Sequence, residues 1–148
     1  MIKKITSIDD LSLKDINKIA DDAIKFSLNK KKIKKSKIKN IFNLFLEPST
    51  RTTVSFELAA KKLGHNIINI NFDKSSLSKG ETFNDTIATL VSMKPDALII
   101  RDQKEFSPKE IYNNYKIPII NAGDGKNEHP TQSLLDYALL KKKFGDKK

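Results

Sequence analysis

The sequence predicts an α/β fold in three layers, with a central four-stranded parallel sheet and helices on both of its faces. Short apolar runs alternate with longer segments whose apolar residues recur at helical spacing, giving one opening helix and then four strand–helix units. Polar clusters follow three of these apolar runs, as expected at the carboxyl ends of strands, where such sheets gather ligands. The 148 residues are about one domain long and contain no internal repeat, so we expect a single domain over residues 1–148.

The apolar pattern and the turn residues place each element in order. Ser12 is predicted to cap a helix over residues 13–27, because an apolar stripe at helical spacing follows it: Ile16, Ile19, Ala20, Ala23 and Ile24. The nearly continuous apolar run at 40–46 predicts the first strand. A helix at about 52–63 follows and ends at Gly64; its apolar residues are expected to share one face: Val54, Phe56, Leu58, Ala59 and Leu63.

The second half of the chain repeats the alternation. A cap residue followed by Pro, at Ser107 and Pro108, is a strong helix start. The remaining elements are a strand at 66–71, a polar loop at 73–80, a helix around 86–93 that stops before Pro95, a strand at 97–100 ending at Arg101, a helix from Ser107 to about Tyr115, a strand at 117–121, a turn with Gly123 and Gly125, and a last helix from Pro130 to Gly145.

The composition narrows the class of protein. There are no cysteines, no apolar run approaches the roughly 18 residues of a membrane span, and no signal-peptide pattern opens the chain. We therefore expect a cytoplasmic protein without a membrane partner. Metal-ligand spacings and the glycine-rich nucleotide fingerprints are also missing from the sequence, so we expect no metal and no cofactor.

The net charge of +10 raises the alternative of nucleic-acid binding. Much of the excess lies in the lysine runs at 30–39 and 141–148, which carry no interleaved aromatic residues for base stacking. Arginine, the usual bidentate reader of guanine and phosphate, occurs only at Arg51 and Arg101. We interpret the lysines as a solvated surface and expect no nucleic-acid partner.

The segment Ser49-Thr50-Arg51-Thr52 lies where the second helix begins. The first amides of a helix lack intrahelical acceptors and the helix dipole is positive there, so this turn is suited to bind an anion, phosphate above all. The alternative is that one hydroxyl merely caps the helix. Capping needs a single hydroxyl and leaves the arginine and the second threonine unexplained.

Two further candidates follow later strands. Arg101 ends an apolar strand, and its guanidinium is directed at the crevice unless it pairs with Asp102. His129 precedes the last helix, where the positive dipole favours the neutral imidazole and a hydrogen bond to a carbonyl oxygen. The alternative for His129 is a capping role, with Gln132 on the surface. His65 lies in a plain turn, and we assign it no function.

Four segments resemble a known family. Residues 47–52 with 55–57, and residues 129–136, resemble the two motifs that the aspartate and ornithine carbamoyltransferases share. Residues 75–82 and 121–128 resemble the aspartate enzymes specifically, because the ornithine enzymes carry different sequences in both places. The resemblance covers essentially the whole chain.

The resemblance implies the reaction and the residues that serve it. The carbamoyl group of carbamoyl phosphate would pass to the amino group of L-aspartate, a step of pyrimidine biosynthesis. Phosphate would be held by Ser49, Thr50, Arg51 and Thr52, and the carbonyl oxygen by Thr52, Arg101 and His129. Gln132 would fix the carbamoyl amino group. Ser76 and Lys79 would reach into a neighbouring subunit's site, which implies a homotrimer.

The sequence departs from the family in three respects. Thr53 stands where a second arginine is usual, and Asp102-Gln103 stands where His-Pro is common. The family's second domain, which binds L-aspartate, does not follow within these 148 residues, so they are expected to be either a fragment of a longer protein or a naturally shortened relative. We expect the isolated chain to be inactive or very weak. Two alternatives stay open: a non-catalytic phosphate-binding trimerisation module, and an enzyme of the ornithine type. Regulatory chains are partners that the resemblance also leaves open.

Overall fold

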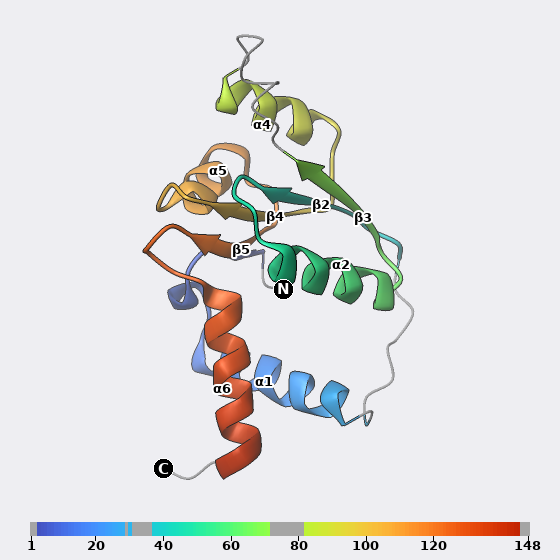
Figure 1. Ribbon diagram of the computed structural model, residues 1–148, viewed down its shortest axis with the longest axis vertical. Coiled ribbons are helices and arrows are strands. Elements are labelled where there is room, and N and C mark those ends of the chain that lie inside the picture. The colour runs from blue at the N-terminus through green and yellow to red at the C-terminus, as the bar shows by residue number, and fades with distance from the viewer. Residues whose placement is uncertain (1–2, 29, 31–36, 72–81, 146–148) are drawn as a thin grey trace.

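The computed structural model describes residues 3–28, 30, 37–71 and 82–145, and within them five parallel strands form one sheet in the order β1-β5-β4-β2-β3 (Figure 1). The predicted parallel sheet is thus confirmed, but its predicted four strands are wrong by one. The additional strand, β1 (Lys4–Ile5), pairs with β5 through Lys4↔Ile119 and Ile5↔Ile120. Two residues are too few to display a strand's alternation, and only their tertiary partner identifies them.

The elements follow the predicted alternation closely. After β1 they are the 3-10 helix η1 (Ile8–Asp10), α1 (Leu13–Ser27), β2 (Asn40–Phe45), α2 (Thr50–Lys62), β3 (Asn66–Asn71), α4 (Phe83–Ser92), β4 (Ala97–Asp102), α5 (Ser107–Tyr115), β5 (Ile119–Asp124) and α6 (Pro130–Phe144). Ser12 caps α1 as predicted, in a capping box with Asp15.

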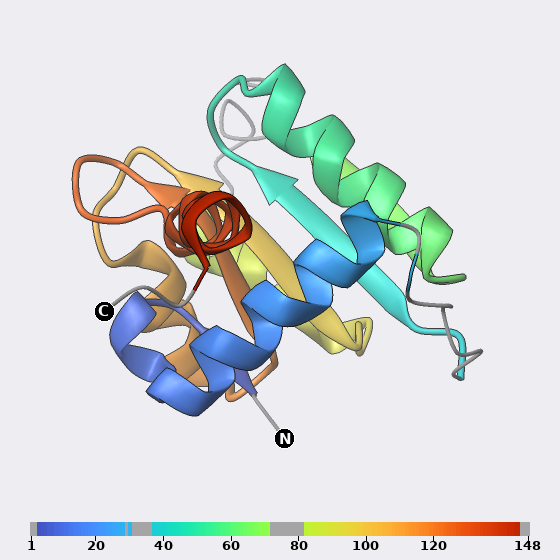
Figure 2. The same cartoon turned by 90° about the horizontal axis from the view of Figure 1, so that it is seen from below.

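Helices cover both faces of the sheet, as predicted (Figures 1 and 2). Helices α4 and α5 lie on one face, and α1, α2 and α6 lie on the other. The main core fills the space under α4 and α5 and consists of Phe42, Leu44, Ile87, Leu90, Leu98, Ile100, Ile111, Ile117 and Ile119. Burial of this apolar set drives the α/β layering.

Helix α2 is turned differently from the prediction. Val54, Leu58 and Leu63 are exposed, and the residue that α2 buries is Ala60. Glu57, on the side of the helix that faces the sheet, accepts a hydrogen bond from Asn69 Nδ2 of β3 at 2.8 Å. The small and polar residues therefore decide which side of α2 meets the sheet, and three of the apolar residues are left facing outward.

Strand β5 extends further toward the site than predicted, ending at Asp124 instead of residue 121. Its last residues are polar or small but fully buried, with Asn121 0% and Asp124 1% exposed. Pro118 lacks an amide hydrogen, which delays the start of the strand to Ile119.

One end of the lysine-rich tail has a structural role. Lys141 Nζ lies 2.9 Å from Asp21 Oδ1 and 3.0 Å from Asn17 Oδ1, and so ties α6 to α1. The interpretation of this run as a solvated surface is therefore wrong for Lys141. Among the described residues, none of the helices has the length and apolar character needed to cross a bilayer.

Candidate active site

The candidate site lies at the carboxyl edge of three neighbouring strands. Strands β5, β4 and β2 are adjacent in the sheet, so the segments that follow them meet at the same edge. The turn at 47–52 follows β2, Arg101 lies at the end of β4, and the loop after β5 leads to His129. The predicted convergence of these three segments is present in the fold.

The first turn of α2 is open to a ligand. Ser49 is the N-cap, but its side chain makes no capping hydrogen bond. Within the described part of the chain, no acceptor bonds the backbone amides of Thr50, Arg51 and Thr52, and no acidic side chain occupies the first turn. The capping alternative for the Ser49 hydroxyl is therefore wrong, and the helix N-terminus keeps its positive potential.

Thr53, the first departure from the family pattern, has a local structural role. Its hydroxyl donates to the Ser49 carbonyl at 2.8 Å, and its amide donates to the same oxygen at 3.0 Å. Thr53 thus reinforces the start of α2 and directs no side-chain group at the open amides.

Arg101 pairs with Glu47, and the predicted alternative of a pair with Asp102 is wrong. Arg101 Nε lies 2.5 Å from Glu47 Oε1, out of line for a hydrogen bond, so the contact is chiefly one of opposite charges. The Nη1 group donates to the Ala122 carbonyl at 3.1 Å. Asp102 instead accepts from the backbone amide of Lys104 at 3.1 Å. The guanidinium is thereby fixed at the edge of the sheet.

Gly123 is the point at which Arg101 and His129 converge. A Cβ atom on this residue would lie 2.8 Å from Arg101 Nη1 and 3.3 Å from His129 Cδ2. Its φ of +117° also lies in a region that other residues rarely adopt. Sequence reasoning assigned Gly123 only to a turn, because nothing local shows which side chains press on it.

His129 caps α6, which is the alternative that the sequence offered, and its second ring nitrogen is not used in the cap. As N-cap of α6 its Nδ1 accepts a long hydrogen bond of 3.4 Å from the Gln132 amide, and the Thr131 hydroxyl lies 3.3 Å from the same nitrogen. If Nδ1 accepts, the ring proton of the neutral form is on Nε2, which is then a donor. Burial first, and the Arg101 charge second, lower the pKa of His129. The imidazole is therefore neutral at pH 7, as predicted, but mainly because of burial.

Gln132 is exposed, and its side chain is already oriented. Its Nε2 donates to Asp136 Oδ1 at 2.9 Å. The amide oxygen has no hydrogen-bond donor among the described residues. It is therefore available to accept a hydrogen bond.

Two small hollows meet at His129. One, of about 270 Å³, is lined by Thr52, His129 and Gln132, together with residues of α2 and α6. The other, of about 230 Å³, is lined by Glu47, Arg101, Gly123 and His129, together with the rest of the loop after β5. The structure thus brings Thr52, Arg101, His129 and Gln132 together around one imidazole.

The other predicted site residues lie elsewhere. Ser49, Thr50 and Arg51 line neither hollow, and Thr50 and Arg51 are exposed at the helix start. Ser76 and Lys79 lie outside the described residues. No group of three or more His, Cys, Asp or Glu side chains within residues 3–28, 37–71 and 82–145 is placed to hold a metal ion.

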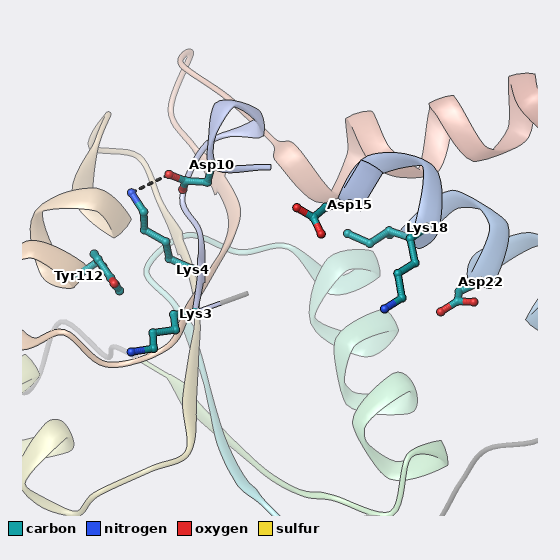
Figure 3. A pocket seen from close by; sticks show the side chains of 8 residues that line it. Lys3, Lys4, Asp10, Asp15, Lys18, Asp22 and Tyr112 are labelled. Atoms are coloured by element: carbon teal, nitrogen blue, oxygen red, sulfur yellow. Dashed lines mark ion pairs between the residues drawn. The ribbon is translucent and has the colours of Figure 1, made fainter. Parts of the chain in front are cut away.

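A larger hollow of about 800 Å³ lies away from these residues, between the start of the chain, α1 and α5 (Figure 3). Its lining is charged, but the charges balance one another: Lys4 Nζ pairs with Asp10 Oδ1 at 2.6 Å and lies 5.3 Å from the centre of the Tyr112 ring. None of the predicted site residues lines it.

Comparisons with known proteins agree with one family. Residues 3–142 match the family described as aspartate/ornithine carbamoyltransferase, carbamoyl-P binding domain. An aspartate carbamoyltransferase catalytic subunit from Pelagibacter ubique is 44% identical in an alignment of 142 residues that covers 93% of this chain and 45% of that protein.

Solved structures agree as well. Aspartate transcarbamoylase from Trypanosoma cruzi, in complex with carbamoyl phosphate and aspartate, superposes with a TM-score of 0.85 at 34% identity, over 98% of this chain and 49% of that one. Ornithine carbamoyltransferase from Gloeobacter violaceus has a TM-score of 0.78 at 28% identity, over 97% of this chain and 46% of that one. The chain spans about half the length of the relatives it matches.

Proposed function

Because this chain belongs to the aspartate/ornithine carbamoyltransferase family, as its carbamoyl-phosphate-binding domain, we propose that it supplies the carbamoyl-phosphate half of an aspartate carbamoyltransferase active site. The reaction is the transfer of the carbamoyl group to the amino group of L-aspartate, which yields N-carbamoyl-L-aspartate and phosphate for pyrimidine biosynthesis. The observation that supports this best is the open helix N-terminus at Ser49–Thr52 on the same sheet edge as Arg101 and His129.

The phosphate binds at the start of α2. The free amides of Thr50, Arg51 and Thr52 and the unused Ser49 hydroxyl donate to its oxygens, and the helix dipole favours its negative charge. The Arg51 guanidinium adds charge-assisted hydrogen bonds. The absence of acidic residues from this turn leaves that potential intact.

The carbonyl oxygen of the bound carbamoyl group accepts from Thr52, Arg101 and His129 Nε2. When the amine attacks the carbonyl carbon, negative charge develops on this oxygen, and each placed donor commonly contributes about 3–4 kcal/mol of transition-state stabilisation. The bond from carbon to the bridging oxygen then breaks. Phosphate leaves and accepts the proton of the amine, so no separate protein base is needed. Gln132 Oε1 accepts from the carbamoyl amino group and orients it.

The second substrate and the assembly complete the proposal. L-aspartate binds only where the family's second domain is present, so the 148-residue chain alone is inactive or very weak. Ser76 and Lys79 reach a neighbouring subunit's site in a cytoplasmic homotrimer, and regulatory chains remain open as partners. The motifs at 75–82 and 121–128 favour aspartate over ornithine as the acceptor.

The test combines binding with turnover. We expect this chain to bind phosphonoacetamide, in which a methylene group replaces the bridging oxygen of carbamoyl phosphate, with Arg51→Ala and His129→Ala each weakening that binding. In a chain that carries the aspartate domain, the same substitutions should reduce carbamoyl-aspartate formation. Unchanged turnover in both variants would overturn the assignment. Binding without turnover in the longer chain would favour the non-catalytic module, and carbamoylation of ornithine would favour the ornithine-type enzyme.

A further inference from the structure

The loop between β5 and α6 is held first by a buried carboxylate. Asp124, 1% exposed, accepts four hydrogen bonds. Its Oδ1 accepts from Asn121 Nδ2 at 2.9 Å and from the Glu128 amide at 3.1 Å, and its Oδ2 accepts from the Phe106 amide at 2.8 Å and from Asn127 Nδ2 at 3.0 Å. The Asp124 amide in turn donates to the Glu128 carbonyl at 3.0 Å. The loop therefore closes on itself at Asp124 and Glu128.

A second carboxylate attaches this loop to the beginning of the chain. Glu128 Oε1 accepts from the Ser7 hydroxyl at 2.7 Å, and its Oε2 accepts from the Ile8 amide at 2.9 Å. The segment that donates is itself rigidly bonded, since Asp10 Oδ2 accepts from the amides of Thr6 and Ser7 at 2.7 and 3.1 Å. Glu128 thus rests on a fixed support 120 residues away in the sequence.

We propose that Glu128 is a positioning residue for His129: by bonding the turn at Ser7 and Ile8, it fixes the chain immediately before His129 and so sets the place of the imidazole beside Arg101. The proposal rests on the proposed function, in which His129 Nε2 donates to the carbamoyl oxygen.

The backbone of His129 lies between two anchors. On its carboxyl side, the His129 carbonyl accepts from the amides of Gln132 and Ser133 at 2.9 and 3.1 Å as α6 begins. On its amino side, the neighbouring residue is Glu128, with its side chain on the N-terminal turn. Between these anchors the ring packs against Gly123, where a Cβ would lie 3.3 Å from His129 Cδ2. Release of the Glu128 anchor would let the ring move away from Arg101 and toward water.

The chemistry of the contact defines a conservative variant. In Glu128→Gln the amide oxygen can accept from the Ile8 amide, while the amide nitrogen can donate to the Ser7 hydroxyl oxygen. The contact is then kept without its charge. In Glu128→Ala both bonds are lost, and in Ser7→Ala only one is.

The first experiment follows the two histidines of the chain by NMR during a pH titration of the 148-residue protein, with His65 as internal reference. In Glu128→Ala we expect the pKa of His129 to rise toward its ordinary value, because the ring gains water and loses the proximity of Arg101. Loss of the negative charge of Glu128 alone would instead lower the pKa of His129. Ser7→Ala should raise the pKa by less, and Glu128→Gln, which can keep both hydrogen bonds, should not raise it.

Glu110→Ala is the matched charge control, because it removes an exposed carboxylate of α5 that pairs with Lys104. It should leave the pKa of His129 unchanged. A His129 pKa that stays the same in Glu128→Ala, or that shifts equally in Glu128→Gln, would overturn the positioning role.

The second experiment compares two ligands. Phosphonoacetamide carries a carbonyl for His129, whereas inorganic phosphate does not reach it. In Glu128→Ala we expect roughly tenfold weaker binding of phosphonoacetamide, the effect of one misplaced donor, with phosphate binding nearly unchanged. An equal loss for both ligands would indicate general destabilisation and overturn the positioning role. If the NMR signals of His129 in the wild type do not change when phosphonoacetamide is added, the proposed function is wrong. The pKa measurement then still tests the positioning role of Glu128.

Discussion

The two halves of the candidate site differ in how many of their polar groups already have a partner within the protein. In the loop half, which consists of Arg101, Gly123, Asp124 and His129, the guanidinium is paired, the carboxylate has four donors, and the imidazole caps a helix. In the helix half, Ser49–Thr52, the hydroxyl of the N-cap and three amides have no partner among the described residues.

This difference separates two tasks. A donor that must meet a developing charge on one atom benefits from fixed placement, because no reorganisation is then needed in the transition state. A phosphate that must enter and leave benefits from donors that are exposed and unoccupied. We therefore expect substitutions in the loop half to affect stability and ligand binding together, and substitutions in the helix half to affect ligand binding alone.

The largest effect is expected for Gly123→Ala. The new methyl group would lie 2.8 Å from Arg101 Nη1, at a backbone φ of +117°. We expect a loss of about 3 kcal/mol in the free energy of unfolding, measured in urea, and loss of phosphonoacetamide binding. Gly145→Ala is the matched control, because φ there is +69° but the space is open; it should cost about 1 kcal/mol. Equal losses of unfolding free energy at the two positions would show that the contact with Arg101 does not contribute to the effect of Gly123→Ala.

The next largest effect is expected for Asp124→Asn. Each carboxylate oxygen faces two donors, so an amide nitrogen in either place would meet two N–H groups. We expect about 2–3 kcal/mol of lost stability in the same urea experiment. Asp136→Asn is the comparison on the surface, where a single exposed hydrogen bond to Gln132 is at stake, and its cost should stay within about 0.5 kcal/mol. A mild Asp124→Asn variant would contradict the view that the loop half depends on its buried hydrogen bonds.

Arg51→Ala should separate the two halves most clearly. The side chain is exposed, and no ion pair is found for it among the described residues. Stability should therefore change by less than about 0.5 kcal/mol. The affinity for inorganic phosphate, measured by calorimetry, should fall roughly tenfold or more, since a charge-assisted contact is lost. A drop in melting temperature without loss of phosphate affinity would assign Arg51 to the structure.

A smaller effect is expected for Glu47→Gln, which removes the charge that holds Arg101. Partly exposed ion pairs contribute up to about 1 kcal/mol, so the freed guanidinium should bind phosphonoacetamide about threefold more tightly. Inorganic phosphate is the internal comparison, because it binds in the helix half. Weaker phosphonoacetamide binding would mean that Glu47 orients Arg101 for the ligand.

The smallest effect concerns pH. The folded state lowers the pKa of His129, through burial and then the Arg101 charge. In mildly acidic solution the unfolded chain therefore binds more protons at His129 than the folded chain does. The contribution of the neutral His129 to the free energy of unfolding is present above the unfolded pKa and is lost as the pH falls through the folded pKa. Melting temperatures measured between pH 7.5 and 5 should decline less for His129→Gln than for the wild type. Parallel declines would place the titration elsewhere.

The sequence predicted the layers and most elements because apolar periodicity reports directly on burial. Helix α1 begins and ends where Ser12 and the apolar stripe predicted. Strand β1 was not predicted, because its two residues, Lys4 and Ile5, are too few to show the alternation of apolar and polar residues that marks a strand. The wrong side was predicted for α2, because Ala60 and Glu57, which face the sheet, are less conspicuous in the sequence than Val54 and Leu58.

The candidate site was predicted unevenly for a related reason. Residues with distinctive chemistry at strand ends, such as Arg101 and His129, can be recognised locally. Asp124 and Glu128 resemble ordinary turn residues, and only tertiary contacts show that the Asp124 carboxylate accepts four hydrogen bonds and the Glu128 carboxylate two. The sequence offered its neighbour Asp102 as the alternative partner of Arg101, but the pairing of β2 with β4 brings Glu47, from the turn after β2, to the guanidinium instead.

The strand order has a consequence for how the chain acquires its fold. Within the part of the chain that the structure describes, β1 pairs with β5 and with no other strand, and the turn after β1 bonds Glu128. Neither contact can therefore form until almost all of these residues have been synthesised. Contacts of such long sequence separation are slow to close and form late. We therefore expect the turn that supports the histidine to dock as a final event, after β2, β3 and β4 have paired. In a nascent chain that ends before β5, the residues of β1 would have no strand to pair with.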